Sequence, residues 1–284
     1  MIERVFKENA SLFDPLVKKA KLEITPPTVD HPEADFENIR KALNKNLSIS
    51  RRLVSILPEF LRKNNWQINI AFTENEIIDF LEKDTKIYAV SVDIGTTTVA
   101  LALIDLEEGK ILEIASCYNS QINYGDDVIT RIIYAVENKN GLEILRKCIV
   151  EDINALINTV SLKHKEGKIL YVTVSSNTTM AHIFWGINPK YIRQEPYTPA
   201  LNHYPVWNAS QAKLLLQPDV PVYTVPSVAG YVGGDIVAGI LSSGMYLQEE
   251  ISLFIDIGTN GEVVIGNNQW LVTASTSAGP CFEG

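Results

Sequence analysis

The sequence predicts an α/β protein with two related half-domains, the first complete with a mixed sheet and the second only begun. Three observations predict this class. The tetrapeptide Asp-Ile-Gly-Thr occurs twice, at 93–96 and 256–259, which lie 163 residues apart. Each copy stands between two apolar, strand-like runs and therefore predicts a β-hairpin. After the first copy, strand and helix patterns alternate to about residue 241, and the second copy then starts the series again.

The composition fits a globular protein and excludes several classes of function. The chain has 284 residues, of which 46% are hydrophobic, and this is enough for a packed core. A net charge of −9 gives no bulk attraction to nucleic acid. No run of 18 apolar residues and no signal-peptide core occur, so we expect a cytoplasmic protein without a membrane span. Cys117, Cys148 and Cys281 are widely spaced, which provides neither a zinc ribbon nor an iron–sulfur loop.

Residues 1–85 differ from the rest because they contain no glycine. We expect 1–34 to be an extended linker or arm, since Thr25-Pro26-Pro27-Thr28 cannot be helical. Residues 35–85 then predict a small α/β middle domain for packing or spacing. Its expected elements are a helix that starts near Asp30–Pro32, a helix over 53–61, a strand over 67–72 and a third helix, capped by Thr73 and Glu76, that runs to Leu81.

Residues 86–250 predict the first complete half-domain, and 251–284 the start of the second. The expected strands are at about 87–93, 98–105, 110–117, 169–175 and 222–225, and the expected helices are at 128–136, 141–163, 180–185 and 228–241. Thr178 or Thr179 is the expected N-cap of the helix at 180–185. A connection rich in Pro and Tyr, 188–221, is expected to pack on its own half-domain.

The repeated motif predicts a phosphate site that uses a metal ion. Gly95 and Gly258 allow a turn with positive φ and a close approach of the main chain to a ligand. Turn N–H groups and Thr hydroxyls suit phosphate oxygens. An Asp would repel bare phosphate, but it becomes favourable when Mg²⁺ lies between them. The motif therefore favours a magnesium nucleotide, although two ordinary hairpins would have the same sequence pattern.

Several segments carry a family resemblance. The order of elements with two Asp-x-Gly-Thr loops resembles the superfamily of acetate and sugar kinases, Hsp70 and actin. More closely, the chain resembles the ATP-dependent reductive activators of corrinoid proteins. The segments that carry this closer resemblance are Val92-Asp-Ile-Gly-Thr-Thr-Thr-Val-Ala, Tyr124-Gly-Asp-Asp-Val-Ile-Thr-Arg131-Ile, Ser175-Ser-Asn-Thr-Thr-Met-Ala-His182, Pro196-Tyr-Thr-Pro, Pro226-Ser-Val-Ala-Gly-Tyr-Val-Gly-Gly-Asp235, Ser277-Ala-Gly-Pro-Cys-Phe-Glu-Gly284 and the linker Pro26-Pro27-Thr-Val-Asp-His-Pro-Glu-Ala-Asp35.

The resemblance implies two ribonuclease-H-like ATPase lobes, of the actin and Hsp70 type, that close on Mg-ATP. It implies an activator that drives reduction of an inactive Co(II) corrinoid protein to Co(I) for methyl transfer. The implied partner is a corrinoid protein or a corrinoid-dependent methyltransferase, and a homodimer stays open. The family also carries an N-terminal [2Fe–2S] domain, for which this sequence has no cysteine motif, and only 28 residues follow Asp256. We therefore expect a fragment that is inactive by itself.

The resemblance and the motif together assign roles to individual residues. Asp93 and Asp256 are the candidate Mg²⁺ ligands, and Asp93 and Asp235 are the candidate catalytic groups. Asp235 is equally well explained as an acid that stabilises a helix N-terminus. The candidate nucleotide-binding residues are Gly95, Thr96, Thr97 and Thr98 in the first loop, Gly258, Thr259, Asn260 and Gly261 in the second, and Ser176 and Asn177 at a strand end.

Some polar residues and two other functions stay open. Ser176 and Asn177 could instead cap a helix. Asp126 and Asp127 are expected to do so, although paired carboxylates beside a cleft could reach a metal ion. His182 is expected to be a partly buried histidine with satisfied hydrogen bonds rather than a catalytic one. Besides the activator, the sequence allows another kinase of the superfamily that acts on a small molecule. It also allows a nucleotide-binding scaffold that is not an enzyme. The motifs do not identify the corrinoid partner, the methyl donor or the electron donor.

Overall fold

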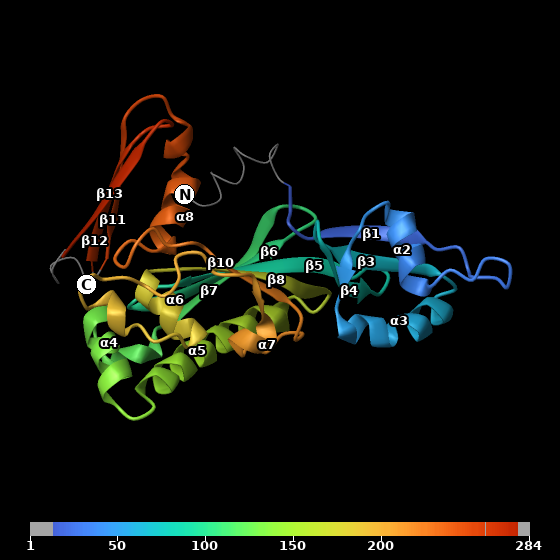
Figure 1. The fold of residues 1–284 in the computed structure, drawn as a ribbon, viewed down its shortest axis with the longest axis horizontal. Coiled ribbons are helices and arrows are strands. Elements are labelled where there is room, and N and C mark those ends of the chain that lie inside the picture. Colours follow the sequence, from blue (N-terminus) through green and yellow to red (C-terminus); the bar gives the residue numbers. More distant parts are fainter. Residues whose placement is uncertain (1–13, 259, 278–284) are drawn as a thin grey trace.

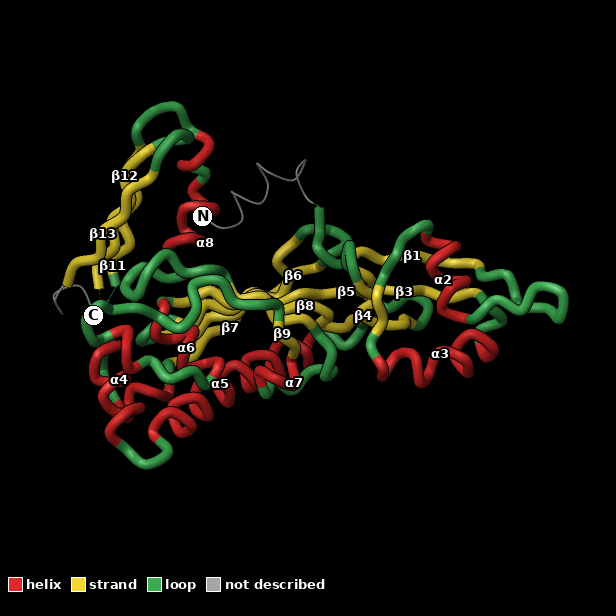
Figure 2. The backbone as a smooth tube through the Cα atoms, viewed as in Figure 1, coloured by secondary structure: helices red, strands yellow, loops and turns green. Residues whose placement is uncertain are grey.

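The computed structural model describes residues 14–258 and 260–277. They form a small module at one end of the long axis, a central lobe on a six-stranded sheet, and a three-stranded sheet at the other end (Figure 1). The same three sheets stand out as strands in Figure 2. Within the described residues, no helix has the length and apolar character needed to cross a membrane.

The small module is a four-stranded sheet with two helices, and its strand order is β1-β3-β4-β2. Helix α3 packs Leu53, Leu57 and Leu61 into the module's core, where none is more than 2% exposed. Burial of each such side chain contributes about 1.5–3 kcal/mol. The elements are β1 (Lys18–Glu23), α2 (Asp35–Leu43), β2 (Ser48–Ile49), α3 (Arg51–Lys63), β3 (Gln67–Phe72) and β4 (Glu76–Leu81).

The structure corrects three of our expectations in this module. Residues 76–81 form strand β4 instead of a helix, because the Thr73 hydroxyl accepts a hydrogen bond from the Glu76 N–H at 3.1 Å and closes a tight turn between β3 and β4. Strand β1, which pairs with β3, lies within the segment that we expected to be an arm. Helix α2 begins at Asp35, after Ala34 in an extended conformation, and therefore later than Pro32.

The central lobe is built on a mixed sheet with the strand order β7-β6-β5-β8-β10-β9. Strands β5, β6 and β7 form an antiparallel meander, β8 and β10 run parallel to β5, and β9 is an antiparallel edge strand. The strands are β5 (Lys86–Ile94), β6 (Thr98–Asp105), β7 (Lys110–Tyr118), β8 (Gly167–Ser176), β9 (Trp207–Asn208) and β10 (Pro221–Thr224).

The helices of the lobe cover this sheet. In Figure 1, α4, α5 and α7 lie on one side of it, and the long helix α5 packs across β6 and β7. Leu145, Ile149 and Ile153 of α5 are completely buried against Val92 and Leu103 of the sheet. The helices are α4 (Val128–Glu137), α5 (Gly141–Lys163), α6 (Thr178–Trp185) and α7 (Ala209–Ala212), with 3₁₀ turns η2 (Ser120–Tyr124) and η3 (Lys190–Ile192).

Ion pairs fix the small module to the lobe. Asp79 of β4 is buried and accepts a hydrogen bond from Lys168 Nζ of β8 at 2.8 Å. Arg52 Nε of α3 donates to Asp219 Oδ2 at 2.7 Å, and Ser50 Oγ donates to the same oxygen. Lys168 lies on β8, so the module is fixed directly to a central strand of the sheet of the lobe.

The second Asp-Ile-Gly-Thr copy forms a hairpin, as expected, and a third strand extends it. Helix α8 leads into this sheet, and Phe254 of β11 packs on α8 at Gly239, where a Cβ would lie 2.4 Å from the ring. We expected a helix over 228–241, but α8 begins only at Gly234. The elements are α8 (Gly234–Ser243), η4 (Met245–Leu247), β11 (Ser252–Ile257), β12 (Asn260–Gly266) and β13 (Leu271–Ser277).

His182 is a buried structural residue, as the sequence analysis expected. Its side chain is 0% exposed, and its Nε2 accepts a hydrogen bond from the Ala200 N–H at 3.0 Å. This leaves the proton on Nδ1, which contacts the Thr178 carbonyl oxygen and the Tyr204 hydroxyl, each at 2.8 Å. His182 therefore fixes the aromatic connection, including Tyr204, on its own lobe.

We expect His182→Gln to lower the free energy of unfolding by about 2 kcal/mol at pH 7.5, because several buried partners lose their hydrogen bonds. Burial lowers the pKa of His182 below its usual value, so the unfolded chain binds the proton more readily. Wild-type stability should therefore fall as the pH drops below about 6.5, and the variant should lose this part of the pH dependence. Urea unfolding at several pH values measures both effects. The exposed His31→Gln is the control, and equal stability of both variants would contradict the assignment.

Candidate functional site: the acidic cleft between the two hairpins

The first Asp-Ile-Gly-Thr copy forms the turn between β5 and β6. Asp93 is the second-last residue of β5, and the Gly95 N–H donates to the Thr98 carbonyl oxygen at 3.0 Å across the turn. A Cβ on Gly95 would lie 2.7 Å from that same oxygen. Glycine is thus required by a close backbone approach. The positive φ that glycine would allow here is not used, because the φ of Gly95 lies outside the left-handed region.

The loop is held from the interior of the lobe by two residues to which the sequence analysis gave no role. Asn119 Nδ2 donates to the Gly95 carbonyl oxygen at 2.9 Å, and the Asn119 N–H donates to that of Thr97 at 2.8 Å. Arg131 Nη2 donates to the Thr96 carbonyl oxygen at 2.6 Å. Arg131 lies in one of the segments that carry the family resemblance, and that was the only signal in the sequence. Thr98 is the first residue of β6.

The end of β8 lies beside the loop because β5 and β8 run parallel, with Asp93 opposite Ser175 and Ile94 opposite Ser176. Asn177 is the N-cap of α6, where we expected Thr178 or Thr179, and its Oδ1 accepts from the Met180 N–H at 2.9 Å. Its Nδ2 also donates to Thr96 Oγ1 at 3.4 Å. Asn177 therefore caps a helix and contacts the first loop at the same time.

Helix α8 begins directly against the end of β8. A Cβ on Gly233 would lie 2.4 Å from Asn177 Cα and 2.6 Å from the Ser176 carbonyl oxygen. This contact places Asp235, in the first turn of α8, near the other acids. Burial, together with the carboxylates of Asp93 and Asp256, raises the pKa of Asp235 to about 6, although a hydrogen bond from the Ile236 N–H opposes the shift.

The second hairpin adds two carboxylates to the same group of acids. Asp256 of β11 lies opposite Glu262 of β12 in the antiparallel register. Asp93 is an exposed residue, but neighbouring protein atoms still displace part of the hydration of its carboxylate. This desolvation, together with the carboxylate of Asp256, raises the pKa of Asp93 to about 6. Partial burial and the carboxylates of Asp235 and Asp256 raise the pKa of Glu262 to about 7. Because the carboxylate of Asp256 raises the pKa of each of the other three acids, all four belong to one electrostatic cluster.

The residues of the second loop are described in part. Gly258 is exposed and Gly261 is buried, while Asn260 is the first residue of β12. Thr259 lies outside the described residues. Asp126 precedes α4, and Asp127 caps that helix, since its Oδ1 accepts from the Thr130 N–H at 2.7 Å.

The acidic cluster fits Mg²⁺ that is bound together with phosphate. Within the described part of the chain, no three His, Cys, Asp or Glu side chains converge closely enough to hold a metal ion alone. Mg²⁺ usually keeps several waters and binds through one or two carboxylates plus substrate phosphates. A divalent cation would also relieve the repulsion that raises the pKa values of Asp93, Asp235 and Glu262. The donor set is therefore suited to a metal–phosphate ligand rather than to a resident ion.

We expect Glu262→Gln to stabilise the protein by about 1 kcal/mol at pH 8, a value reduced for the partial exposure of the side chain. The folded chain holds the Glu262 proton up to about pH 7, whereas the unfolded chain releases it near the ordinary glutamate pKa of 4.5. The Glu262 carboxylate therefore lowers the free energy of unfolding, and this effect grows as the pH rises from about 4.5 to above 7. Thermal melts at pH 4.5 and pH 8 measure the effect, with the exposed Glu249→Gln as the control. Destabilisation by Glu262→Gln at pH 8 would contradict the cluster.

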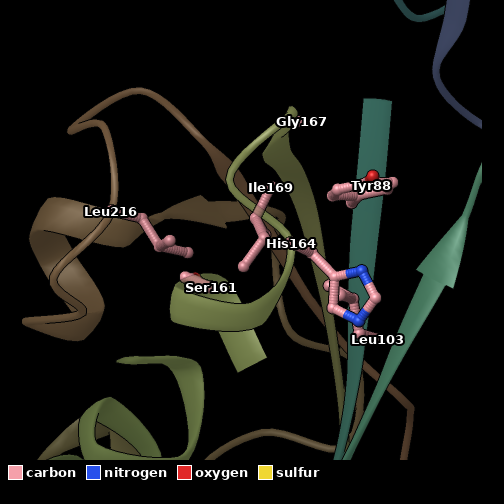
Figure 3. A pocket seen from close by; sticks show the side chains of 7 residues that line it. All are labelled: Tyr88, Leu103, Ser161, His164, Gly167, Ile169 and Leu216. Carbon is pink, nitrogen blue, oxygen red and sulfur yellow. The ribbon is translucent and has the colours of Figure 1, made fainter. Parts of the chain in front are cut away.

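A small pocket of about 60 Å³ lies elsewhere in the lobe and is not a competing nucleotide site (Figure 3). It lies at the start of β5 and β8, where Tyr88 and Gly167 line it, whereas the acidic cleft lies beyond the ends of these strands. Tyr88 donates to Glu166 Oε1 at 2.7 Å, so its hydroxyl is satisfied. This volume holds one or two waters.

Comparisons with known proteins decide the family. Three family models match consecutive parts of the chain: the RACo linker region at residues 7–87, the RACo middle region at 88–248, and the C-terminal ASKHA domain of RACo at 250–284. The middle-region model alone covers more than half of the chain. The chain belongs to the RACo family.

Relatives of this RACo-family chain have been named by function. It is 33% identical over 281 residues to the corrinoid activation enzyme RamQ of Eubacterium limosum, covering 96% of this chain and 47% of RamQ. It is 25% identical over 206 residues to the [Co(II) methylated amine-specific corrinoid protein] reductase of Methanosarcina barkeri, covering 69% of this chain and 37% of that protein. The chain thus spans about half, or less, of the length of these curated relatives.

A solved structure confirms the fold. The reductive activator for corrinoid, iron–sulfur protein superposes with a TM-score of 0.88 at 42% identity, over 96% of this chain and 45% of that one. Together with the ASKHA-domain match, this confirms the predicted α/β class with an ATPase-type lobe. The resemblance drawn from the sequence segments is confirmed as well. The three family models meet at 87–88 and at 248–250.

Proposed function

We propose that this RACo-family chain is the nucleotide-binding part of an ATP-dependent reductive activator. The activator drives one-electron reduction of an inactive Co(II) corrinoid protein to the Co(I) form that accepts a methyl group. The names of RamQ and of the Methanosarcina barkeri reductase favour this function over a small-molecule kinase or a scaffold. The observation that supports it most is the convergence of Asp93, Asp235, Asp256 and Glu262 between two Asp-Ile-Gly-Thr hairpins.

The residues of the cleft suggest a division of labour. Asp93 and Asp256 would hold Mg²⁺ through water, and Mg²⁺ would neutralise phosphate charge when bound. The first loop, Gly95 to Thr98, and the second, Gly258 to Gly261, would contact phosphate oxygens. Ser176 is 2% exposed, and its Oγ has no partner among the described residues, so a water molecule could connect this hydroxyl to a bound nucleotide.

Asp235 is the candidate general base, with Asp93 beside it. Its pKa of about 6 lies close to neutral pH, which suits a carboxylate that must accept a proton from water and release it again. In the proposed hydrolysis, water attacks the γ-phosphorus and loses a proton to Asp235, the bond from that phosphorus to the β,γ-bridging oxygen breaks, and ADP leaves. The free energy of this step would favour a state of the complex in which cobalt accepts an electron.

The electron must come from a separate low-potential donor. The described residues offer no cluster of three metal-ligating side chains that could hold a redox centre. A [2Fe–2S] centre is the donor that the family resemblance implies, and such a centre would supply the one electron that each Co(II) needs to become Co(I). We further propose a cytoplasmic location, a corrinoid protein or its methyltransferase as partner, and a homodimer as a state to be tested.

The test combines two anaerobic assays of the full-length protein that contains this chain, with a Co(II) corrinoid protein, Mg-ATP and Ti(III) citrate as the reductant. One follows the visible spectrum of Co(I), and the other follows phosphate release. We expect Co(I) to form faster with ATP than without it, and ATP hydrolysis to rise as corrinoid protein is added. A flat hydrolysis rate together with ATP-independent reduction would contradict the proposal. The Asp235→Asn variant should bind Mg-ATP but hydrolyse it slowly.

A further inference from the structure

We infer that Arg131 is the positioning residue of the first phosphate loop. Together with Asn119, it holds the loop so that backbone N–H groups of the loop face the phosphate. This inference rests on the proposed function, because it concerns how the same cleft recognises the phosphates of a nucleotide. Neither residue would touch the ligand. Both would act through the backbone of residues 95–97.

Arg131 is an unusual residue for the interior of a protein. Its side chain is 0% exposed, and no carboxylate of the described chain lies within ion-pair distance of its guanidinium group. It donates instead to uncharged acceptors: the Gly125 carbonyl oxygen at 2.9 Å, Gln121 Oε1 at 3.2 Å, the Thr96 carbonyl oxygen at 2.6 Å and Met180 Sδ at 3.4 Å. The carboxylates of Asp126 and Asp127 act on the guanidinium only from beyond ion-pair distance. Burial of an unpaired charge is costly, so the arrangement calls for an explanation beyond packing.

The contact with Thr96 is one of three that act on consecutive carbonyl groups. Asn119, which is also 0% exposed, donates from its side chain to Gly95 and from its backbone to Thr97, at 2.9 and 2.8 Å. The carbonyl oxygens of residues 95, 96 and 97 are therefore all drawn towards donors inside the lobe. A turn of this kind does not need three internal donors in order to close, because the Gly95 N–H to Thr98 bond already closes it.

The planarity of the peptide group determines where the N–H groups of the first loop point. In a trans peptide the N–H points opposite to the C=O, so carbonyls turned inward leave the following N–H groups turned outward. The N–H groups of Thr96 and Thr97 donate to no group of the described chain. Consecutive free N–H groups on one side of a loop form a nest that binds anions. The buried positive charge of Arg131 lies behind this nest and adds to its attraction for phosphate.

A matched control exists in the same lobe. Arg146 of α5 also donates to two backbone carbonyl oxygens, those of Phe184 at 3.1 Å and Gln211 at 2.7 Å, but neither belongs to the first loop. Arg146→Met therefore removes an arginine that bridges backbone carbonyls without affecting residues 95–97. Arg146 is only half-buried, so its substitution should destabilise the fold less than that of Arg131. The comparison therefore concerns Mg-ATP binding by variants whose thermal melts show that they are folded.

The test measures Mg-ATP binding by calorimetry for wild type, Arg131→Met, Arg131→Lys and Arg146→Met, with thermal melts of each. We expect Arg131→Met to weaken binding at least tenfold, Arg131→Lys to weaken it less, and Arg146→Met to stay within twofold of wild type. A folded Arg131→Met protein that binds as wild type does would overturn the inference. Absence of binding by wild type would instead contradict the proposed function.

A second measurement keeps the inference testable if Arg131→Met does not fold. In ¹⁵N-labelled wild-type protein, the amide signals of Thr96 and Thr97 should shift on addition of Mg-ATP, as new hydrogen bonds to phosphate form. Their hydrogen exchange should also slow. Unchanged Thr96 and Thr97 amides, in a protein whose other cleft signals respond to Mg-ATP, would overturn the inference and leave the proposed function standing.

Discussion

Asp93→Asn and Asp256→Asn should each weaken Mg-ATP binding at least tenfold while the fold stays intact. Asparagine has nearly the shape of aspartate, but it has no charge and is a poor partner for hydrated Mg²⁺. The loss of one carboxylate also removes repulsion within the cluster, since Asp256 raises the pKa of Asp93. Binding should therefore fall although the thermal stability of the free protein rises slightly. Calorimetry and a thermal melt of each variant measure the two quantities.

The control for these variants is Asp84→Asn. Asp84 is exposed in the turn between β4 and β5, with φ of 69°, a conformation that asparagine also adopts readily. This change should leave binding as in wild type. The double variant of Asp93 and Asp256 should lose less free energy of Mg-ATP binding than the sum of the losses in the two single variants, because both carboxylates act on one ion. Fully additive losses would indicate two independent effects and would contradict a shared metal site.

Gly233→Ala should have the largest effect on the site from outside the acidic cluster. The added Cβ would lie 2.4 Å from Asn177 Cα and 2.6 Å from the Ser176 carbonyl oxygen, and backbone atoms cannot be displaced cheaply. The start of α8 must therefore move away from the end of β8, and Asp235 must move with it. We expect a loss of about 2–3 kcal/mol in the free energy of unfolding and a loss of Mg-ATP binding and hydrolysis.

Gly244→Ala is the matched control for this change. Gly244 ends α8 with a φ of 69°, and no atom lies within 4 Å of a Cβ built there. Alanine at this position should cost about 1 kcal/mol through backbone strain but leave Asp235 in place. Urea unfolding and calorimetry separate the two variants. If Gly233→Ala binds Mg-ATP as Gly244→Ala does, the contact between α8 and β8 does not position the site.

The sequence was sufficient for the long elements of the fold but not for the short ones. Helix α5 and strands β5 to β7 are regular, apolar and long, so their periodicity predicted them within one or two residues. Strand β4 was mistaken for a helix because Thr73 and Glu76 have the residue types of a capping box, although they close a β-turn. Strand β1 was missed since its apolar positions are few and only its pairing with β3 buries Leu22.

The residues of the candidate site also fall into two groups, those that the sequence predicted and those that only the structure revealed. Asp93 and Asp256 were visible because a repeated motif marks them, and Asp235 because it follows two glycines. Glu262 was missed because it joins the cluster only through its register opposite Asp256. Arg131 was missed because a contact across 35 residues, from α4 to Thr96, leaves no local pattern. Positions that act through tertiary contacts therefore needed the structure.

The most direct test of the account is whether metal and nucleotide bind to the cleft together. Calorimetry with ADP, in the presence of Mg²⁺ and in the presence of excess EDTA, measures this for wild type, Asp93→Asn and Asp256→Asn. We expect wild type to bind ADP tightly only with Mg²⁺, and we expect both variants to lose this Mg²⁺-dependent increase in affinity. Wild-type binding that is equal with and without Mg²⁺, or that survives both substitutions, would contradict a metal–phosphate site between the two hairpins.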